Sequence, residues 1–239
     1  MLTETELIVL KGVKYSDNAS IISTYSEQFG TLAFKVVRSS FRRKARANAL
    51  CMPLSIVRIT FDYHPSRSIH IPREQQILHQ PFITSINPIG NAVGLFTVEL
   101  LTRLLRHSDS DQQLYAYLRG ELMRLEQMND RGLSSFHLQL MSGLLLRLGI
   151  LPSTDGYKVG HILDFSEGVF RYPWGSSDPI QVAACATLVQ FITQPNPEEL
   201  PLRRDERQAL LQLLIDYTAY HFPEVGALNS PEILSQIFE

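Results

Sequence analysis

The hydrophobic pattern changes its period once along this chain, near Pro81. Before that point the apolar residues fall in five short runs that are rich in β-branched and aromatic side chains. After it they recur every three or four residues. The first pattern predicts strands and the second predicts amphipathic helices. The sequence therefore predicts an α+β protein with a β domain over residues 1–80 and a helical domain over residues 81–239.

The five apolar runs are short and are separated by polar turns; they cover residues 6–15, 20–25, 31–37, 55–63 and 68–78. In the fourth run, SIVRITFDY, Val57, Ile59 and Phe61 alternate with Arg58 and Thr60, which is the period of a strand with one wet face. Five short strands within about 70 residues fit a small closed barrel of the oligonucleotide-binding (OB) kind better than a sandwich. The β domain is therefore expected to be an OB-fold barrel.

Helix boundaries are marked in the second part of the chain. Asn87-Pro88 predicts the start of a first helix, and either Asp109 or Ser110 can cap a second one. A third is expected from Ser134 or Ser135 to Gly149, a residue suited to a left-handed helix end.

Residues 150–178 then interrupt this helical pattern with glycines, prolines and a weak hairpin signal in LDFSEGVFRY. Helices are expected again from Asp178-Pro179, over residues 202–222 and from Ser230-Pro231. We therefore expect an all-helical domain with one irregular insert.

The charge of the chain is unevenly distributed. Residues 1–80 hold eleven Lys and Arg against six Asp and Glu, a formal charge of +5, and the remainder carries −7, so the total is only −2. Six of the cations stand in KVVRSSFRRKAR, between the third and fourth predicted strands, with Phe41 among them. Cations that follow a phosphate backbone, together with aromatic faces for stacking, are what single-strand binding requires. The predicted DNA-binding residues are Lys35, Arg38, Phe41, Arg42, Arg43, Lys44 and Arg46.

Two other interpretations of this segment stay open: a solvated loop, and a loop that binds an acidic protein in a non-enzymatic adaptor. The neighbouring strands supply further aromatic residues, Tyr25, Phe34, Phe61 and Tyr63, some of which must fill the barrel core. Sequence alone does not say which.

Motifs for other chemistry are lacking in the sequence. There is no phosphate-binding glycine loop, no nucleophile elbow and no paired histidine or cysteine spacing of a metal site. Cys51 and Cys185 stand among apolar neighbours, as reduced core cysteines do. We therefore expect a non-enzyme with no catalytic residue, metal or cofactor. The short apolar run Leu7 to Leu10, and the lack of any membrane-length run, lead us to expect a cytoplasmic protein.

Five segments resemble, in order, the RecO family of bacterial recombination mediators: ELIVLKGVKYSDNASIISTYSEQFGTLAFKVVRSS, ALCMPLSIVRI, VELLTRLL, FHLQLMSGLLLRLGILP and LNSPEIL. In the first of them, Ser26 stands where the family has Thr in the turn that ends at Gly30. The resemblance implies an N-terminal OB barrel and a C-terminal helical domain. It also implies a nucleoid-associated protein that binds single- and double-stranded DNA and anneals complementary strands. Its implied partners are RecR and the acidic C-terminal tail of the single-stranded-DNA-binding protein, with which it loads the recombinase.

The chain departs from the family in its insert, where many members hold zinc with four cysteines. Residues 150–178 contain no cysteine and only His161, so we expect a metal-free insert. Packing should hold it instead, through Ile162, Phe165, Phe170, Tyr172 and Trp174. An acidic partner tail would need a hydrophobic groove beside an arginine, for which Arg103, Arg119, Arg124 and Arg147 are the candidates.

Overall fold

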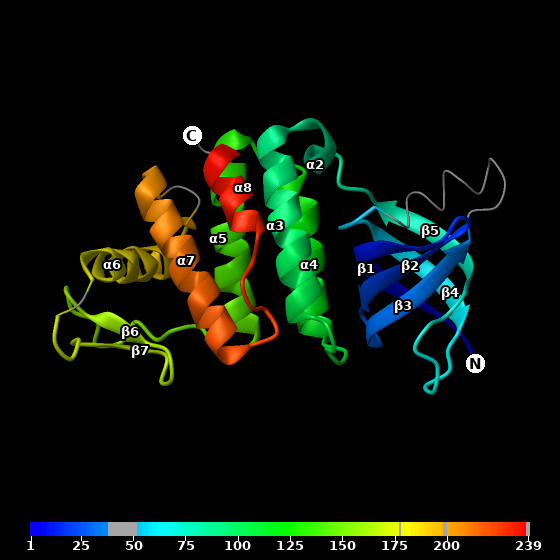
Figure 1. Cartoon of the computed structure of the whole chain (residues 1–239), viewed down its shortest axis with the longest axis horizontal. Helices are drawn as coiled ribbons and strands as arrows, with labels where there is room; N and C mark the ends of the chain where they lie inside the picture. The colour runs from blue at the N-terminus through cyan, green and yellow to red at the C-terminus, as the bar shows by residue number, and fades with distance from the viewer. Residues whose placement is uncertain (38–51, 177, 198–199, 238–239) are drawn as a thin grey trace. The chain divides into compact units, whose positions relative to one another are not determined.

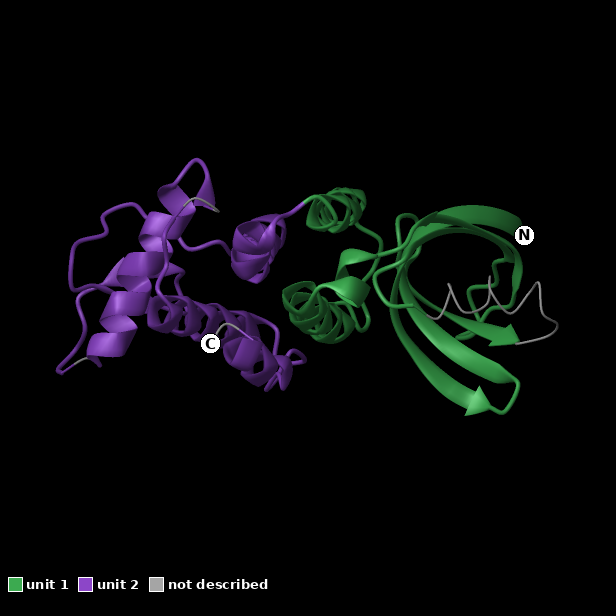
Figure 2. Cartoon of the chain, turned by 90° about the horizontal axis from the view of Figure 1, so that it is seen from above, with its two compact units in different colours: residues 1–127 green, residues 128–239 purple. Residues whose placement is uncertain are grey.

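The computed structural model describes residues 1–37, 52–176, 178–197 and 200–237. The chain divides into two compact units, residues 1–127 and 128–239 (Figure 2). The first contains a β-barrel and the helices that follow it, and the second contains further helices and a short hairpin. The division into compact units falls after residue 127, so the helices that directly follow residue 80 belong to the same unit as the barrel. The domain boundary expected at residue 80 stays a prediction.

The barrel consists of five antiparallel strands in the order β3-β2-β1-β4-β5 (Figure 1). They are β1 (Leu2–Ser16), β2 (Ala19–Ser26), β3 (Gly30–Val37), β4 (Ile56–Asp62) and β5 (Pro72–His79). Two backbone hydrogen bonds of 2.8 Å close the barrel between β3 and the segment before β5: His70 donates to Ala33, and Lys35 donates to the His70 carbonyl. The predicted five-stranded barrel is confirmed.

The barrel core is formed by the inward-facing side chains of four strands. Its members are Leu7, Val9, Ile22, Leu32, Phe34, Val36, Val57, Ile59 and Phe61, all at most 9 % exposed. The rings of Phe34 and Phe61 meet edge to face with their centroids 5.1 Å apart. The alternation predicted for SIVRITFDY therefore places the expected side of β4 inward.

Strand β1 is unusually long and changes its pairing along its length. Residues Leu2 to Ile8 pair with β4, whereas the pairing with β2 continues to Ser16. A register shift between Val9 and Lys11 separates the two halves. Such a bulge reverses which side chains face the core, because it adds one residue to an alternation of period two.

The helices of the first unit are α2 (Ile83–Ile86), α3 (Pro88–Leu104) and α4 (Gln112–Leu125). As predicted, α3 starts at Asn87-Pro88, where the Asn87 side chain accepts hydrogen bonds from the amides of Ile89 and Gly90. The predicted cap of α4 at Asp109 or Ser110 is wrong. Asp111 caps the helix, because its carboxylate accepts from the amides of Gln113 and Leu114 at 2.9 Å.

The second unit begins with α5 (Asp130–Arg147), followed by β6 (Ile162–Asp164), β7 (Val169–Arg171), α6 (Pro179–Thr193), α7 (Arg204–His221) and α8 (Ser230–Ile237). The start of α5 differs from the prediction at Ser134 or Ser135, since Asn129 caps it through Gly132. Its predicted end is correct, with Gly149 at a φ of 73°. The predicted cap at Asp178 matches, since its side chain accepts from the amide of Ile180. Helix α8 begins at Ser230, where the sequence predicted the start of the last helix.

The insert forms the predicted hairpin, β6 with β7, and packs through part of the expected set of residues. Phe170 is buried, and Phe165 meets the ring of Tyr217 at 5.3 Å. The expectation that Tyr172 and Trp174 help to pack the insert is wrong, since they are 76 % and 102 % exposed. Strand β7 ends at Arg171, so both residues lie beyond the hairpin. Among the residues that the structure describes, no cluster of three or more His, Cys, Asp or Glu could hold a metal ion. Nor is any described helix both long and apolar enough to cross a membrane.

Candidate nucleic-acid interface

The predicted basic segment begins at the end of β3. Of its members only Lys35 lies among the described residues. The others, Arg38, Phe41, Arg42, Arg43, Lys44 and Arg46, lie outside the described residues, and their role as DNA contacts stays a prediction. The three strands nearest to the start of the segment, β1 to β3, lie wholly among the described residues.

Lys35 lies on the outer side of the barrel, where it meets an aromatic ring from β1. Its Nζ atom lies 4.9 Å from the centroid of the Tyr15 ring, which is a cation–π contact. Such a contact contributes about 0.5–1 kcal/mol at an exposed site. It holds an ammonium group and an aromatic ring side by side on the surface of the barrel.

The strand register shows which residues share this surface. Lys11, Ser23 and Ala33 form one row across β1, β2 and β3, and Val13, Ile21 and Lys35 form the next. Together with Tyr15 and Val37 we call these residues the open face; they are Lys11, Val13, Tyr15, Ile21, Ser23, Ala33, Lys35 and Val37. The open face carries two lysines and no carboxylate.

The carboxylate of the β1–β2 turn, close to the open face in sequence, is already paired. Asp17 accepts a hydrogen bond of 2.8 Å from Nζ of Lys14. The pair is neutral, so the net charge of the open face remains positive. This charge is of the right sign to attract a phosphate backbone.

The four aromatic residues of the strands that flank the basic segment lie elsewhere. Phe34 and Phe61 belong to the barrel core and are at most 1 % exposed. Tyr25 is fully buried, with its hydroxyl donating to the carbonyl of Asp109 at 3.3 Å. Tyr63 is half-buried and stacks on His70. None of these four rings lies on the open face, whereas Tyr15, which we did not single out from the sequence, is 62 % exposed there.

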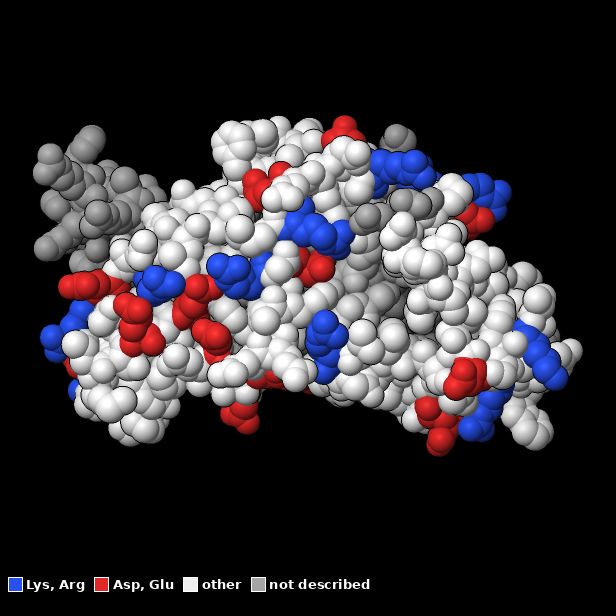
Figure 3. Space-filling model, turned by 180° about the vertical axis from the view of Figure 1, so that it is seen from behind, with Lys and Arg blue, Asp and Glu red and all other residues white. Residues whose placement is uncertain are grey.

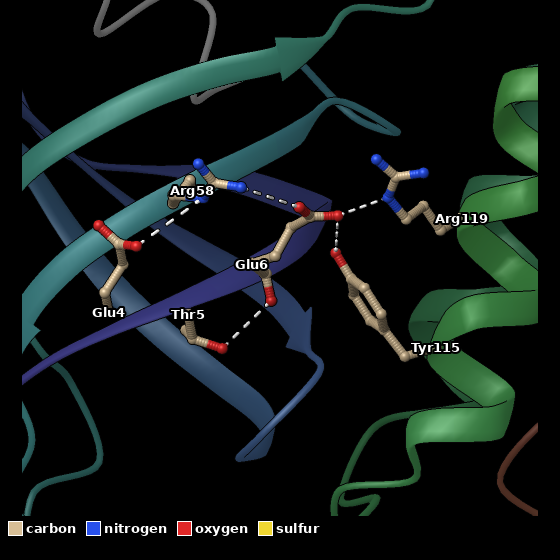
Figure 4. Close-up of polar contacts among 6 residues, drawn as sticks. All are labelled: Glu4, Thr5, Glu6, Arg58, Tyr115 and Arg119. Carbon is tan, nitrogen blue, oxygen red and sulfur yellow. Dashed lines mark hydrogen bonds and ion pairs between the residues drawn. The ribbon is translucent and has the colours of Figure 1, made fainter.

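Toward the start of β1 the same side of the barrel is covered by helix α4. There Glu6 accepts hydrogen bonds from Nε of Arg119 at 2.6 Å and from the hydroxyl of Tyr115 at 3.2 Å (Figure 4). On its other side Glu6 lies 3.9 Å from Arg58 of β4. The hydrogen bond and the charge of Glu6 raise the pKa of Arg119, and burial raises the pKa of Tyr115. Helix α4 is thus fixed to the barrel by a charged carboxylate in a half-buried position.

Replacing Glu6 by alanine should therefore destabilise the first unit. The hydroxyl of Tyr115, a residue only 2 % exposed, would lose its acceptor, and an unsatisfied buried hydroxyl costs about 1–3 kcal/mol. Urea denaturation of the wild type and of Glu6→Ala measures the difference. The control is Glu4→Ala, two residues away, whose side chain is 61 % exposed and lies 3.9 Å from Arg58; it should cost less than about 1 kcal/mol. Equal effects of the two substitutions would contradict this role of Glu6.

The four arginines predicted to bind an acidic partner tail do not form one group. Arg103 pairs with Glu99 and Arg124 with Glu121, each on its own helix at 2.6 Å, and Arg119 pairs with Glu6. Arg147 stands in the last turn of α5, in the other unit. Their role in partner binding stays a prediction, and the structure gives Arg119 a structural role as well.

Elsewhere among the described strands the charge pattern differs from that of the open face. On β1 and β4 the charges alternate in sign, with Glu4 and Glu6 near Arg58. At the end of β4, Asp62 accepts a hydrogen bond from Nε of Arg73 at 2.8 Å. Figure 3 shows positive and negative side chains interspersed over the described residues of one side of the molecule. This mixture is typical of a solvated surface.

Comparison with known proteins gives one consistent result. A family model described as "Recombination protein O N terminal" matches residues 1–80, which include the whole barrel. Over the full length of both chains, the sequence is 30% identical to the DNA repair protein RecO of Bacteroides fragilis and 29% identical to that of Porphyromonas gingivalis. It is 24% identical to the DNA repair protein RecO of Flavobacterium johnsoniae, again over the full length of both. With 30% identity across the entire chain and a matching barrel, this chain belongs to the RecO family.

Proposed function

We propose that this protein binds DNA through its barrel and acts as a recombination mediator in DNA repair. A role in DNA repair comes with membership of a family whose curated relatives are named DNA repair proteins. The observation that carries the binding proposal is the open face, which holds two lysines, an exposed tyrosine and no acidic residue. The open face and the basic segment are continuous in sequence, because Lys35 and Val37 at the end of β3 belong to both.

The finer activities of the proposal follow from the family resemblance. They are binding of single- and double-stranded DNA, annealing of complementary strands, and loading of the recombinase with RecR on strands coated by the single-stranded-DNA-binding protein. Residues 81–239 carry a formal charge of −7 and suit protein partners better than DNA. We propose that the protein is not an enzyme and works in the bacterial nucleoid.

Salt dependence tests the DNA contacts of the basic segment. Removing one cation that neutralises a phosphate of a single strand should reduce the slope of log affinity against log salt by about 0.7, so the triple variant Arg42→Ala, Arg43→Ala, Arg46→Ala should reduce it by about 2. Fluorescence anisotropy with labelled oligo(dT) at several salt concentrations measures the slope. A matched triple variant, Arg147→Ala, Arg171→Ala, Arg203→Ala, removes the same charge from the second unit and should leave the slope unchanged. An unchanged slope in the first variant would contradict DNA binding by this segment.

Strand annealing tests the mediator activity itself. The protein should anneal complementary strands coated with the cognate single-stranded-DNA-binding protein. It should do so more slowly when that protein lacks its acidic C-terminal tail. Failure to bind single strands even at low salt would instead favour the adaptor hypothesis, in which the basic segment binds an acidic protein.

A further inference from the structure

Tyr15 is an aromatic residue of the barrel strands that the fold leaves on the surface. It is 62 % exposed, whereas Tyr25, Phe34 and Phe61 are at most 1 % exposed. Two apolar neighbours on the open face, Val13 and Val37, are 53 % and 52 % exposed. Single exposed apolar residues are common, but three on one sheet face beside an ammonium group are a surface suited to a flat, apolar and anionic ligand.

The charges around Tyr15 restrict the ligand further. Nζ of Lys35 lies 4.9 Å from the ring centroid, and Lys11 lies one row away on the same face. The two lysines are separated by about 7 Å along the strands and by two strand spacings of about 5 Å each across them. The open face has no carboxylate that would repel an anion. A ligand that combines flat apolar rings with regularly repeated negative charges matches both the exposed Tyr15 ring and the two lysines. An apolar peptide lacks the charges and an acidic peptide lacks the flat rings, so a single strand of nucleic acid is favoured.

The residues of the open face that lie between β1 and Lys35 have small or moderate side chains, which leaves the Tyr15 ring accessible. Between β1 and Lys35 the sheet presents Ile21, Ser23 and Ala33, all half-buried side chains of small or moderate size. The exposure of Tyr15 shows that much of its side chain stays uncovered beside its contact with Lys35. The Tyr15 side chain is therefore accessible, with the ammonium group of Lys35 over its ring.

We infer that Tyr15 is a stacking platform for a base of single-stranded nucleic acid, and that Lys11 and Lys35 contact its phosphates. This inference rests on the proposed function and adds to it the residue that recognises unpaired bases. Stacking needs a base whose face is accessible, which a single strand offers and a duplex does not. The open face would thus distinguish single strands from duplexes.

The test uses two labelled single strands of equal length, about 16 nucleotides. One is oligo(dT), and the other is an abasic strand that keeps every phosphate but lacks the bases. Tyr15→Ala should weaken binding of oligo(dT) by about 5- to 10-fold and leave binding of the abasic strand and the salt slope unchanged. Tyr15→Phe keeps the ring and should bind as the wild type does. Lys35→Gln should instead lower the salt slope for both strands by about 0.7.

Two further variants serve as controls for the loss of an exposed tyrosine and for misfolding. Tyr172→Ala removes a tyrosine that is 76 % exposed in the second unit and should change neither affinity. Tyr15→Leu retains apolar bulk without a ring and should reproduce the weaker binding of oligo(dT) if Tyr15→Ala does not fold. Equal affinity of wild type and Tyr15→Ala for oligo(dT), or an equal weakening for both strands, would overturn the inference while DNA binding stands. A wild type that binds neither strand at low salt would overturn the proposed function itself.

Discussion

Replacing Gly30 by alanine is expected to lower the free energy of unfolding of the first unit by about 3 kcal/mol or more. Gly30 is the first residue of β3 and has a φ of 65°, a left-handed conformation that costs other residues about 1–2 kcal/mol. A Cβ atom there would lie 2.2 Å from the carbonyl oxygen of Ser108 and 2.6 Å from the carbonyl carbon of Asp109. Both atoms are backbone, so they cannot move aside as a flexible side chain does.

The close approach at Gly30 exists because the loop between α3 and α4 binds to the β2–β3 turn. The amide of Thr31 donates to the Ser108 carbonyl at 3.0 Å, and the Thr31 hydroxyl donates to the carbonyl of Leu105. On the opposite side of the turn, the Ser26 hydroxyl accepts from the Phe29 amide and donates to the Gly30 carbonyl, both at 3.0 Å. An added methyl group would have to break one of these contacts.

A second glycine separates the steric cost from the conformational cost. Gly156 has a φ of 73°, and a Cβ atom there would meet nothing within 4 Å. Gly156→Ala should therefore cost only about 1–2 kcal/mol, the conformational part alone. Urea denaturation of the two variants measures the difference. If Gly30→Ala is no more destabilising than Gly156→Ala, the loop does not pack on the turn as described.

The strands and most helix ends were predictable because they depend on local chemistry. Alternating side chains predicted β4, and Asn87-Pro88 and Asp178-Pro179 predicted the starts of α3 and α6. Where several capping residues stand close together, as at residues 109–111, the sequence does not decide between them. Each of Asp109, Ser110 and Asp111 can accept a hydrogen bond from a helix amide, and the choice depends on how the loop packs.

The location of the aromatic residues was not predictable, because it depends on a bulge and on helices distant in sequence. Leu7 and Val9 face the core, so an unbroken alternation would send Tyr15 inward as well. The register shift after Val9 reverses the alternation and turns Lys11 and Val13 outward, and a second shift between Lys14 and Ser16 leaves Tyr15 without a partner on β2. Tyr15 is 62 % exposed and contacts Lys35, so it lies outside the core. Tyr25 faces outward, yet the residues that bury it, Asp109 and Tyr115, lie more than 80 positions along the chain. The pairing of Glu6 with Arg119 is equally invisible in the sequence.

The second unit is expected to lose stability on mild acidification because of His137 on α5. This side chain is 1 % exposed, and burial, together with the positive charge of Arg207, lowers its pKa to about 3. Arg207 and Arg204 of α7 line the same small pocket as His137. The folded unit therefore holds His137 in the neutral form down to low pH.

The sign of the effect follows from the two pKa values. In the unfolded chain histidine takes up a proton near pH 6.5, whereas in the folded unit it does so only near pH 3. The stability contribution is thus fully present above pH 6.5 and is lost progressively as the pH falls toward 3. Between pH 7.5 and pH 5 the loss should be about 2 kcal/mol. Hydrogen bonds from Arg73 and Ser166 lower the pKa values of Asp62 and Asp164. Protonation of these two carboxylates would therefore destabilise the protein only below pH 5, outside the interval from pH 7.5 to pH 5.

His137→Gln removes the ionisable group and should make the unfolding free energy of the second unit less dependent on pH by about 2 kcal/mol over this interval. Urea denaturation at pH 7.5 and pH 5 measures this dependence, and the control is His107→Gln, which changes an exposed histidine in the first unit. The substitution itself is expected to destabilise the unit at both pH values, because it alters a packed site. The diagnostic quantity is therefore the difference between the two pH values within each variant. A difference as large in His137→Gln as in the wild type would show that His137 is already protonated in the folded unit at pH 5, contrary to the lowered pKa.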